Sequence, residues 1–218
     1  VLLCSAGKAM TATLAAQLVE EGKLSWQSTL GEILDEPEAK IHPAWKAVTL
    51  VQLLQHRAGA PGDGSRIWTL LRAHFSRGVP EEKRRFVVSR TLAAPPVYPP
   101  GTRYGYASID YLMVGEMLRK VTGRPWEELM RERLWTPQGM TSAGYGAPGR
   151  PELIDQPWGH WGMVMNGRPV KPGGFWVRLN VPLFFGPAGA AHMTMGDWAK
   201  FVTLHLRGDQ AKPNHVPT

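Results

Sequence analysis

The sequence predicts a single domain over residues 1–218 that is mainly α-helical with long loops, and three observations predict this fold class. Apolar residues recur every three to four positions along most of the chain, as they do in amphipathic helices. From residue 156 to residue 189, tryptophan, glycine and proline break this period and allow only short extended pieces. The length of 218 residues, of which 43% are hydrophobic, suffices for one substantial core.

The predicted helices carry recognisable ends. Gly22 and Gly59 are natural residues just past a helix C-terminus, Thr49 with Gln52 forms a capping box, and Ser108 is an expected N-cap. In chain order the predicted helices span residues from about 5 to 22, 30–34, 49–59, 67–78, 80–93, 108–123, 125–134 and 194–208. The pattern allows short extended pieces at residues 161–165 and 175–179.

The first turn of the chain, Cys4-Ser5-Ala6-Gly7-Lys8, holds a chemically useful pair. If residues from about Ser5 onward are helical, Ser5 and Lys8 are three positions apart and lie on one face. A serine hydroxyl is a poor nucleophile until another group takes its proton, and an amine one turn away can tune that transfer. The positive end of the helix dipole and the free Ser5 amide would both favour a developing oxyanion. This spacing also arises by chance, so its context has to decide.

That context resembles a known family. Ser5-Ala6-Gly7-Lys8 opens a series of blocks that stand in the order found in the serine β-lactamase and penicillin-recognising hydrolase superfamily, and the sequence is most similar to its class C-like β-lactamase and esterase branch. The further blocks are residues 18–26, 48–59 (VTLVQLLQHRAG), 100–108 (PGTRYGYAS), 186–189 (GPAG) and 197–201 (DWAKF). These blocks span nearly the whole chain, whereas a Ser-x-x-Lys tetrad that arose by chance would match at one place only.

The resemblance implies the α/β (α+β) fold of β-lactamases and transpeptidases, and it implies site residues. In that family a Tyr-x-Asn motif supplies a tyrosine that helps move the proton of the nucleophile and activate the deacylating water. Carried over, the catalytic residues are Ser5, Lys8 and Tyr106, with Tyr104 as a second candidate. Ser108 stands where the family usually has an asparagine that binds the substrate amide, and a serine cannot supply that amide's donor and acceptor together. This departure weakens a β-lactam assignment and leaves an esterase assignment open.

Two histidines are further candidates. His160-Trp161-Gly162 resembles the third motif of the family, but that motif follows the Asp197 block in the family, so we expect no catalytic role for His160. His56, one turn before a predicted helix end, is expected to hydrogen-bond locally rather than to belong to a catalytic triad.

After the Asp197 block, the sequence stops before any Lys-Thr-Gly or His-x-Gly block. We therefore expect a partial domain, which lacks most of the central antiparallel sheet that the resemblance implies. The closing strand, which would carry the third motif and the second oxyanion donor, would also be missing.

Composition bears on partners and location. The net charge of +7 invites a nucleic-acid interpretation, but the one dense basic run, Lys83-Arg84-Arg85, follows two glutamates and is typical of a solvated helix face. The single cysteine, Cys4, rules out an intrachain disulfide and is expected to be a small buried packing residue. The sequence contains no run of about 18 apolar residues, so no membrane span is predicted. An export signal upstream could be missing, so a periplasmic, secreted or cytoplasmic location stays open.

Other chemistries fit the sequence less well. It contains no Gly-x-Ser-x-Gly elbow, no His-Glu-x-x-His pattern and no phosphate-binding loop, so neither a metal nor a cofactor is expected. The sequence predicts a serine hydrolase that works through an acyl-enzyme on a small molecule. The substrates that the resemblance implies are a β-lactam, a short-chain ester or a D-amino-acid peptide, and the sequence does not choose among them. Two alternatives remain: a D-alanyl-D-alanine carboxypeptidase-like peptidase, and a catalytically silent penicillin-binding-like scaffold or sensor. The oligomeric state is not predicted.

Overall fold

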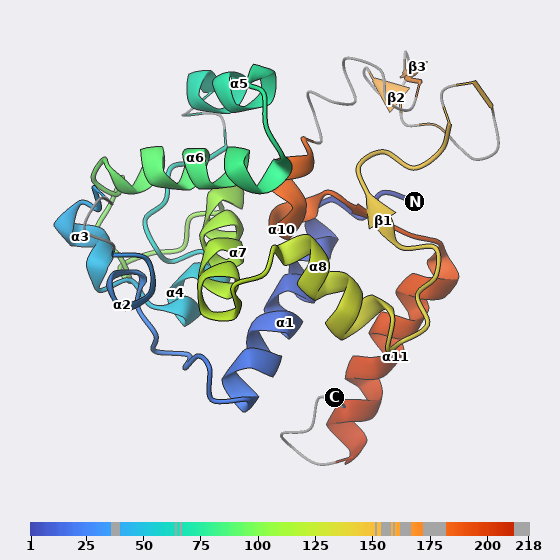
Figure 1. The fold of residues 1–218 in the computed structure, drawn as a ribbon, viewed down its shortest axis with the longest axis horizontal. Coiled ribbons are helices and arrows are strands. Elements are labelled where there is room, and N and C mark those ends of the chain that lie inside the picture. The colour runs from blue at the N-terminus through green and yellow to red at the C-terminus, as the bar shows by residue number, and fades with distance from the viewer. Residues whose placement is uncertain are drawn as a thin grey trace.

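The structure is a computed structural model, shown in Figure 1. It describes residues 1–35, 40–63, 65, 67–150, 152–153, 158, 160–161, 167–171 and 182–211. In chain order its elements are η1 (Cys4–Gly7), α1 (Lys8–Glu20), α2 (Leu30–Leu34), α3 (Pro43–Lys46), α4 (Leu50–Leu54), α5 (Ile67–Phe75), α6 (Pro80–Leu92), α7 (Ser108–Thr122), α8 (Trp126–Met130), η2 (Arg131–Trp135), β1 (Gly144–Tyr145), β2 (His160–Trp161), β3 (Arg168–Pro169), η3 (Leu183–Phe185), α10 (Gly186–Gly189), β4 (Ala191–His192) and α11 (Met195–Ala211). The prediction of a mainly helical chain with little sheet is confirmed.

Helix α7 lies at the centre of the packing. It contacts α1, α2, α4, α6, α8 and α10, and Figure 1 shows α5 and α6 stacked beyond one end of it. Its side chains Leu112, Met113, Met117 and Leu118 have no exposed surface. Burial of such a side chain contributes about 1.5–3 kcal/mol, so α7 is a rigid support for the residues just before it.

A buried ion cluster anchors α6 to this centre. Arg84 is 1% exposed, and its guanidinium donates to both carboxylate oxygens of Glu127 in α8, at 2.8 and 2.9 Å. It also lies 3.4 Å from the carboxylate of Glu116 in α7. The prediction that Lys83-Arg84-Arg85 is a solvated face is therefore wrong for Arg84, because the buried carboxylates on two other helices could not be read from the local sequence.

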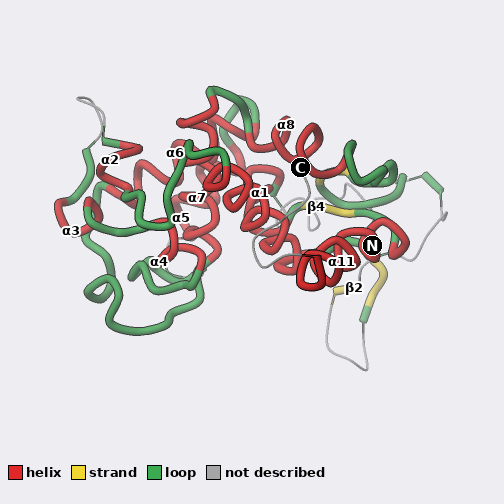
Figure 2. The backbone as a smooth tube through the Cα atoms, turned by 90° about the horizontal axis from the view of Figure 1, so that it is seen from below, coloured by secondary structure: helices red, strands yellow, loops and turns green. Residues whose placement is uncertain are grey.

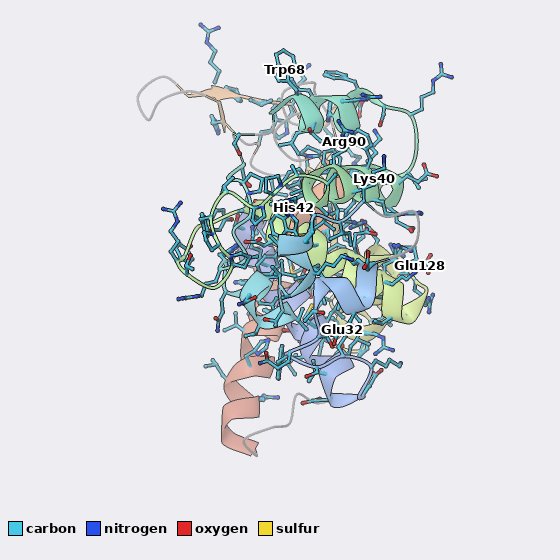
Figure 3. All side chains as sticks on the ribbon, turned by 90° about the vertical axis from the view of Figure 1, so that its left-hand side faces the viewer. Glu32, Lys40, His42, Trp68, Arg90 and Glu128 are labelled. Carbon is cyan, nitrogen blue, oxygen red and sulfur yellow. The ribbon has the colours of Figure 1, made fainter. Side chains whose placement is uncertain are left out.

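Side-chain caps define several helix starts. The predicted capping box of Thr49 and Gln52 is present at α4, with both hydrogen bonds formed. A second box joins Thr29 to Glu32 at α2, and Figure 3 labels Glu32 on this helix. The N-caps of α2 and α4 also bridge to each other, Thr29 opposite Thr49. These caps fix where α4 begins and hence where the loop after it emerges.

Four predicted helix ends are wrong, and one of them is that of α5, which ends at Phe75 rather than near Gly78. Helix α4 stops at Leu54 rather than near Gly59, because His56 adopts a left-handed conformation with φ of 56°. Helix α11 continues through Gly208 to Ala211, since one glycine weakens a helix without having to end it. Ser108 is the first residue of α7 rather than its N-cap, and its N–H donates to the carboxylate of Asp63 at 2.7 Å. The cap comes from a distant loop, which local sequence does not show.

The described strands form two small antiparallel sheets. β1 pairs with β4, and β2 pairs with β3. The start of the chain joins the first of these sheets, since Leu2 bridges to His192, and Figure 2 shows the N-terminus at the same end of the molecule as β4 and α11. The expected extended piece at 161–165 is described only at Trp161, and the one at 175–179 lies outside the described residues. None of the described helices is long and apolar enough to cross a bilayer.

Candidate active site

The N-terminal segment presents Ser5 on a strained turn. The Leu3 N–H donates to the carbonyl oxygen of Ala191 at 2.9 Å, which holds the chain against β4. Cys4 follows with φ of 48°, a left-handed conformation that costs a residue other than glycine about 1–3 kcal/mol. The turn leaves both Cys4 and Ser5 exposed, so the prediction that Cys4 is buried is wrong. Ser5 therefore lies in the 3-10 turn η1 with its side chain open to solvent.

Lys8, the first residue of α1, is buried and fully hydrogen-bonded. The residue is 6% exposed. Its Nζ donates to Ser5 Oγ at 3.1 Å, to the Tyr106 hydroxyl at 2.7 Å and to the Ala188 carbonyl at 2.6 Å. An ammonium has three N–H donors, and these three acceptors use all of them. The geometry fixes the ammonium beside the serine oxygen.

Tyr106 completes the cluster from the loop that precedes α7. Its hydroxyl lies 2.6 Å from Ser5 Oγ and 2.7 Å from Lys8 Nζ. Burial acts to raise the pKa of Tyr106, but the hydrogen bonds with Lys8 and Ser5 outweigh it and hold the pKa below the ordinary value. The Tyr106 side chain remains partly open to solvent, with 42% of the residue exposed. The structure thus brings Ser5, Lys8 and Tyr106 together with every pair of functional atoms within hydrogen-bond distance.

The third acceptor for Lys8 comes from α10, which is fixed by packing on two helices. Thr11 Oγ of α1 donates to the carbonyl of Pro187 at 2.8 Å. Gly115 of α7 faces the Pro187 ring, where a Cβ on residue 115 would lie 2.5 Å from Cγ. Only glycine allows this approach, so Gly115 helps to set the position of the Ala188 carbonyl. Sequence reasoning recognised the 186–189 block without identifying this role for it.

Ser108 does not point a free hydroxyl at the cluster. Its Oγ–H donates to Asp63 at 2.8 Å, and its backbone N–H donates to the other oxygen of the same carboxylate at 2.7 Å. Because the only proton of the hydroxyl is directed at Asp63, the Ser108 side chain has only acceptor capacity left. Sequence reasoning missed Asp63, which stands in a turn-rich loop where nothing local reveals its partner.

His56 is buried behind the cluster rather than bonded locally. Its Nδ1 lies 2.9 Å from Oδ2 of Asp110, a carboxylate with no exposed surface in the first turn of α7. The prediction of a local hydrogen bond is therefore wrong, because the partner lies far along the chain. Asp110 was also missed, although a charged residue among the apolar positions of a helix is a signal for a buried partner.

The remaining candidates stay outside the cluster. His160 lies in β2 and is exposed, and within the described residues no hydrogen bond or ion pair joins it to Ser5, Lys8 or Tyr106. Tyr104 is 63% exposed, and its ring meets the His56 ring edge-on at 6.0 Å. In the part of the chain that the structure describes, no group of three or more His, Cys, Asp or Glu side chains is placed to hold a metal ion.

Comparison with solved structures identifies the fold. A D-stereospecific amidohydrolase from Streptomyces sp. superposes with a TM-score of 0.71 at 20% identity, over 96% of this chain and 61% of that one. The fold is that of the β-lactamase/transpeptidase-like class.

Comparison of sequences then identifies the family. The Beta-lactamase family model matches residues 1–216, and the chain belongs to this family. Penicillin-binding protein 4 of Amycolatopsis lactamdurans is 28% identical over 202 residues, which are 93% of this chain and 49% of that protein. Lovastatin esterase of Penicillium rubens is 28% identical over 169 residues, which are 69% of this chain and 41% of that protein. The chain thus spans about half the length, or less, of these relatives.

Proposed function

We propose that this chain carries the nucleophile region of a serine hydrolase that works through an acyl-enzyme. The observation that supports this proposal is the closed cluster of Ser5, Lys8 and Tyr106. Lys8 Nζ lies 3.1 Å from Ser5 Oγ and 2.7 Å from the Tyr106 hydroxyl, and that hydroxyl lies 2.6 Å from Ser5 Oγ. The nucleophile and its proton acceptor lie within hydrogen-bond reach, and a third group orients the acceptor. Membership of the Beta-lactamase family agrees with a hydrolase.

In the acylation step, Ser5 Oγ attacks the carbonyl carbon of the substrate. The phenolate form of Tyr106, stabilised by the Lys8 ammonium, takes the serine proton as the new O–C bond forms. The bond to the leaving group then breaks, and the leaving atom takes that proton from Tyr106. The Ser5 N–H is the proposed oxyanion donor on this chain. A positioned general base contributes about 10²–10⁴-fold to such a step.

In the deacylation step, Tyr106 performs the same exchange with water. Its phenolate takes one proton from a water molecule, whose oxygen attacks the acyl carbon. The ester bond to Ser5 breaks, and the proton returns from Tyr106 to Ser5 Oγ. Tyr106 can serve in both directions because the hydrogen bond from Lys8 lowers its pKa against the effect of burial.

Among substrates, we favour short-chain esters over β-lactams and D-amino-acid peptides. The Ser108 hydroxyl donates to Asp63, so it offers no donor to the carbonyl of a substrate side-chain amide. An ester substrate without such an amide loses nothing from this arrangement. A D-alanyl-D-alanine carboxypeptidase-like activity is the second candidate, and a penicillin-binding-like scaffold that does not react is the third.

The first test is intact-mass spectrometry of the full-length protein after exposure to a fluorophosphonate. We expect one adduct, lost in Ser5→Ala and retained in Ser89→Ala, an exposed serine on α6. Hydrolysis of p-nitrophenyl butyrate, nitrocefin and a D-alanyl-D-alanine peptide then ranks the substrates, with the ester expected first. No adduct on a folded protein would overturn the hydrolase proposal and favour the scaffold.

A further inference from the structure

We propose that His56 and Asp110 act as a buried pair that positions the Tyr106 hydroxyl against Ser5 and Lys8. The proposal rests on the function proposed above for this site. It assigns positioning roles to two residues that do not touch the nucleophile. Both act through Tyr106.

The His56 ring lies directly against the Tyr106 ring. Their centroids are 4.6 Å apart with the planes tilted by 46°. Tyr111 packs against the same imidazole, with centroids 5.3 Å apart, so the imidazole contacts two tyrosine rings. A shift of the imidazole would therefore carry the Tyr106 ring, and its hydroxyl, away from Lys8.

The backbone around Tyr106 is tied to His56 as well. The Gly105 N–H donates to the His56 carbonyl at 2.8 Å. The Ala107 N–H lies 3.5 Å from His56 Nδ1. The peptide before Tyr106 is thus hydrogen-bonded to His56, and the peptide after it lies close to the same imidazole.

Asp110 in turn fixes the orientation of His56. Its Oδ2 lies 2.9 Å from Nδ1, and the carboxylate has no exposed surface. Its other oxygen, Oδ1, has no hydrogen-bond partner among the described residues. Burial raises the pKa of Asp110 to about 6, against the opposing effect of the hydrogen bond to His56. A half-satisfied buried carboxylate costs stability, so packing alone would favour an apolar residue at this position.

The backbone of His56 carries a second cost. Its φ of 56° places a residue other than glycine in the left-handed region, at about 1–3 kcal/mol. Backbone strain of this kind concentrates at functional sites, where the surrounding contacts hold it. The strained residue and the under-bonded carboxylate contact each other, and the ring of the strained residue packs against the Tyr106 ring. These two independent costs point to a role for the pair.

Two substitutions at Asp110 and one at Tyr106 test the proposal in the full-length protein. Asp110→Leu removes the acceptor for His56, whereas Asp110→Asn keeps an oxygen at the same place. Misplacement of a catalytic group by about 1 Å costs about 10²-fold, so we expect the rate of fluorophosphonate labelling to fall about 10- to 100-fold in Asp110→Leu and less in Asp110→Asn. In a Tyr106→Phe background, Asp110→Leu should cause no further loss, because both changes remove the same hydroxyl contact.

A second readout does not depend on reactivity. NMR of ¹³Cζ-labelled tyrosine follows the titration of Tyr106, and its pKa should rise in Asp110→Leu as the hydroxyl leaves Lys8. Asp197→Asn is the control. Asp197 lies in α11, is 5% exposed and accepts a hydrogen bond from the Ser142 N–H, and it does not contact the cluster of Ser5, Lys8 and Tyr106. We expect this control to lose stability while the labelling rate and the pKa of Tyr106 stay unchanged.

The outcomes separate this proposal from the proposed function. If the wild-type protein is unreactive but Asp110→Leu still shifts the titration of Tyr106, the hydrolase proposal fails and the positioning role stands. If folded Asp110→Leu keeps both the wild-type labelling rate and the wild-type titration, the positioning role is wrong. An equal loss of rate in the presence and absence of the Tyr106 hydroxyl would also overturn it.

Discussion

Gly115→Ala should separate activity from stability at a position that lies outside the catalytic cluster. The added Cβ would lie 2.5 Å from Cγ and 3.1 Å from Cβ of Pro187. Carbon atoms in contact prefer about 3.5–4.0 Å, so α10 must move by about 1 Å relative to α7. The Ala188 carbonyl moves with it, and its hydrogen bond with Lys8, now 2.6 Å, would stretch beyond the usual limit.

The expected magnitudes follow from these distances. Overpacking costs about 1–3 kcal/mol, and the helix propensity of alanine over glycine returns about 1 kcal/mol. The net loss of folding free energy should therefore be small. The labelling rate of Ser5 should fall about 10- to 100-fold, because Lys8 loses its third acceptor and its fixed position.

The assay compares the rate of fluorophosphonate labelling with the free energy of unfolding in urea. Gly196→Ala in α11 is the matched control, because a Cβ there meets Thr194 Oγ1 at 3.8 Å, an ordinary contact. We expect the control to keep its labelling rate. A folded Gly115→Ala protein that labels as fast as the wild type would refute the link from α7 through α10 to Lys8.

Three further changes probe other parts of the structure. Glu127→Ala leaves the buried Arg84 guanidinium with only the Glu116 carboxylate, 3.4 Å away, among the described residues. It should lower the free energy of unfolding by about 3–5 kcal/mol, measured in urea, and a loss below about 1 kcal/mol would contradict the buried-pair interpretation. Asp63→Ala removes the cap of α7 and should cost about 1 kcal/mol, with partial recovery in Asp63→Asn, measured by thermal unfolding; equal melting temperatures would show that the cap contributes nothing. Burial raises the pKa of Asp110 from 3.8 to about 6, so the folded state binds this proton more tightly than the unfolded chain does. The folding stability that comes from this tighter proton binding is fully present below about pH 4 and is lost as the pH rises through about 6. The difference in unfolding free energy between wild type and Asp110→Asn should therefore change by up to about 3 kcal/mol from pH 4 to pH 7, and a constant difference would contradict the raised pKa. The charges of His56 and Lys8 oppose this rise in pKa, whereas the charge of Asp63 adds to it.

Sequence periodicity and short motifs predicted the features that depend on neighbouring residues. The capping box at Thr49, the helical segments and the family all followed from local patterns and from their order. The Ser5–Lys8 contact needs only one helical turn, so its spacing was enough to place the two side chains together. The contact of Tyr106 with them followed from the family resemblance alone, since about 100 residues separate them.

The remaining site residues could not be predicted because their partners are distant in sequence. Asp63 caps a helix that begins 45 positions later, and His56 meets a carboxylate 54 positions away. The burial of Arg84 depends on Glu127 in another helix, so a charge run that is usually solvated here lies in the core. Local rules describe the cost of such buried or strained groups, but only the tertiary structure shows what offsets it.

Helix α7 connects these observations, because one rigid element sets most of the site. Tyr106 lies two residues before its first residue, Ser108 and Asp110 occupy its first turn, and Gly115 admits α10 one turn further on. Its buried apolar side chains hold the helix in the core, so these four positions move together or not at all. Substitutions in the core of α7 that shift the helix by a fraction of an ångström should therefore reduce activity before they reduce stability. The Ser5 side, held by β4 and the strained Cys4 turn, would stay in place while the tyrosine side moved.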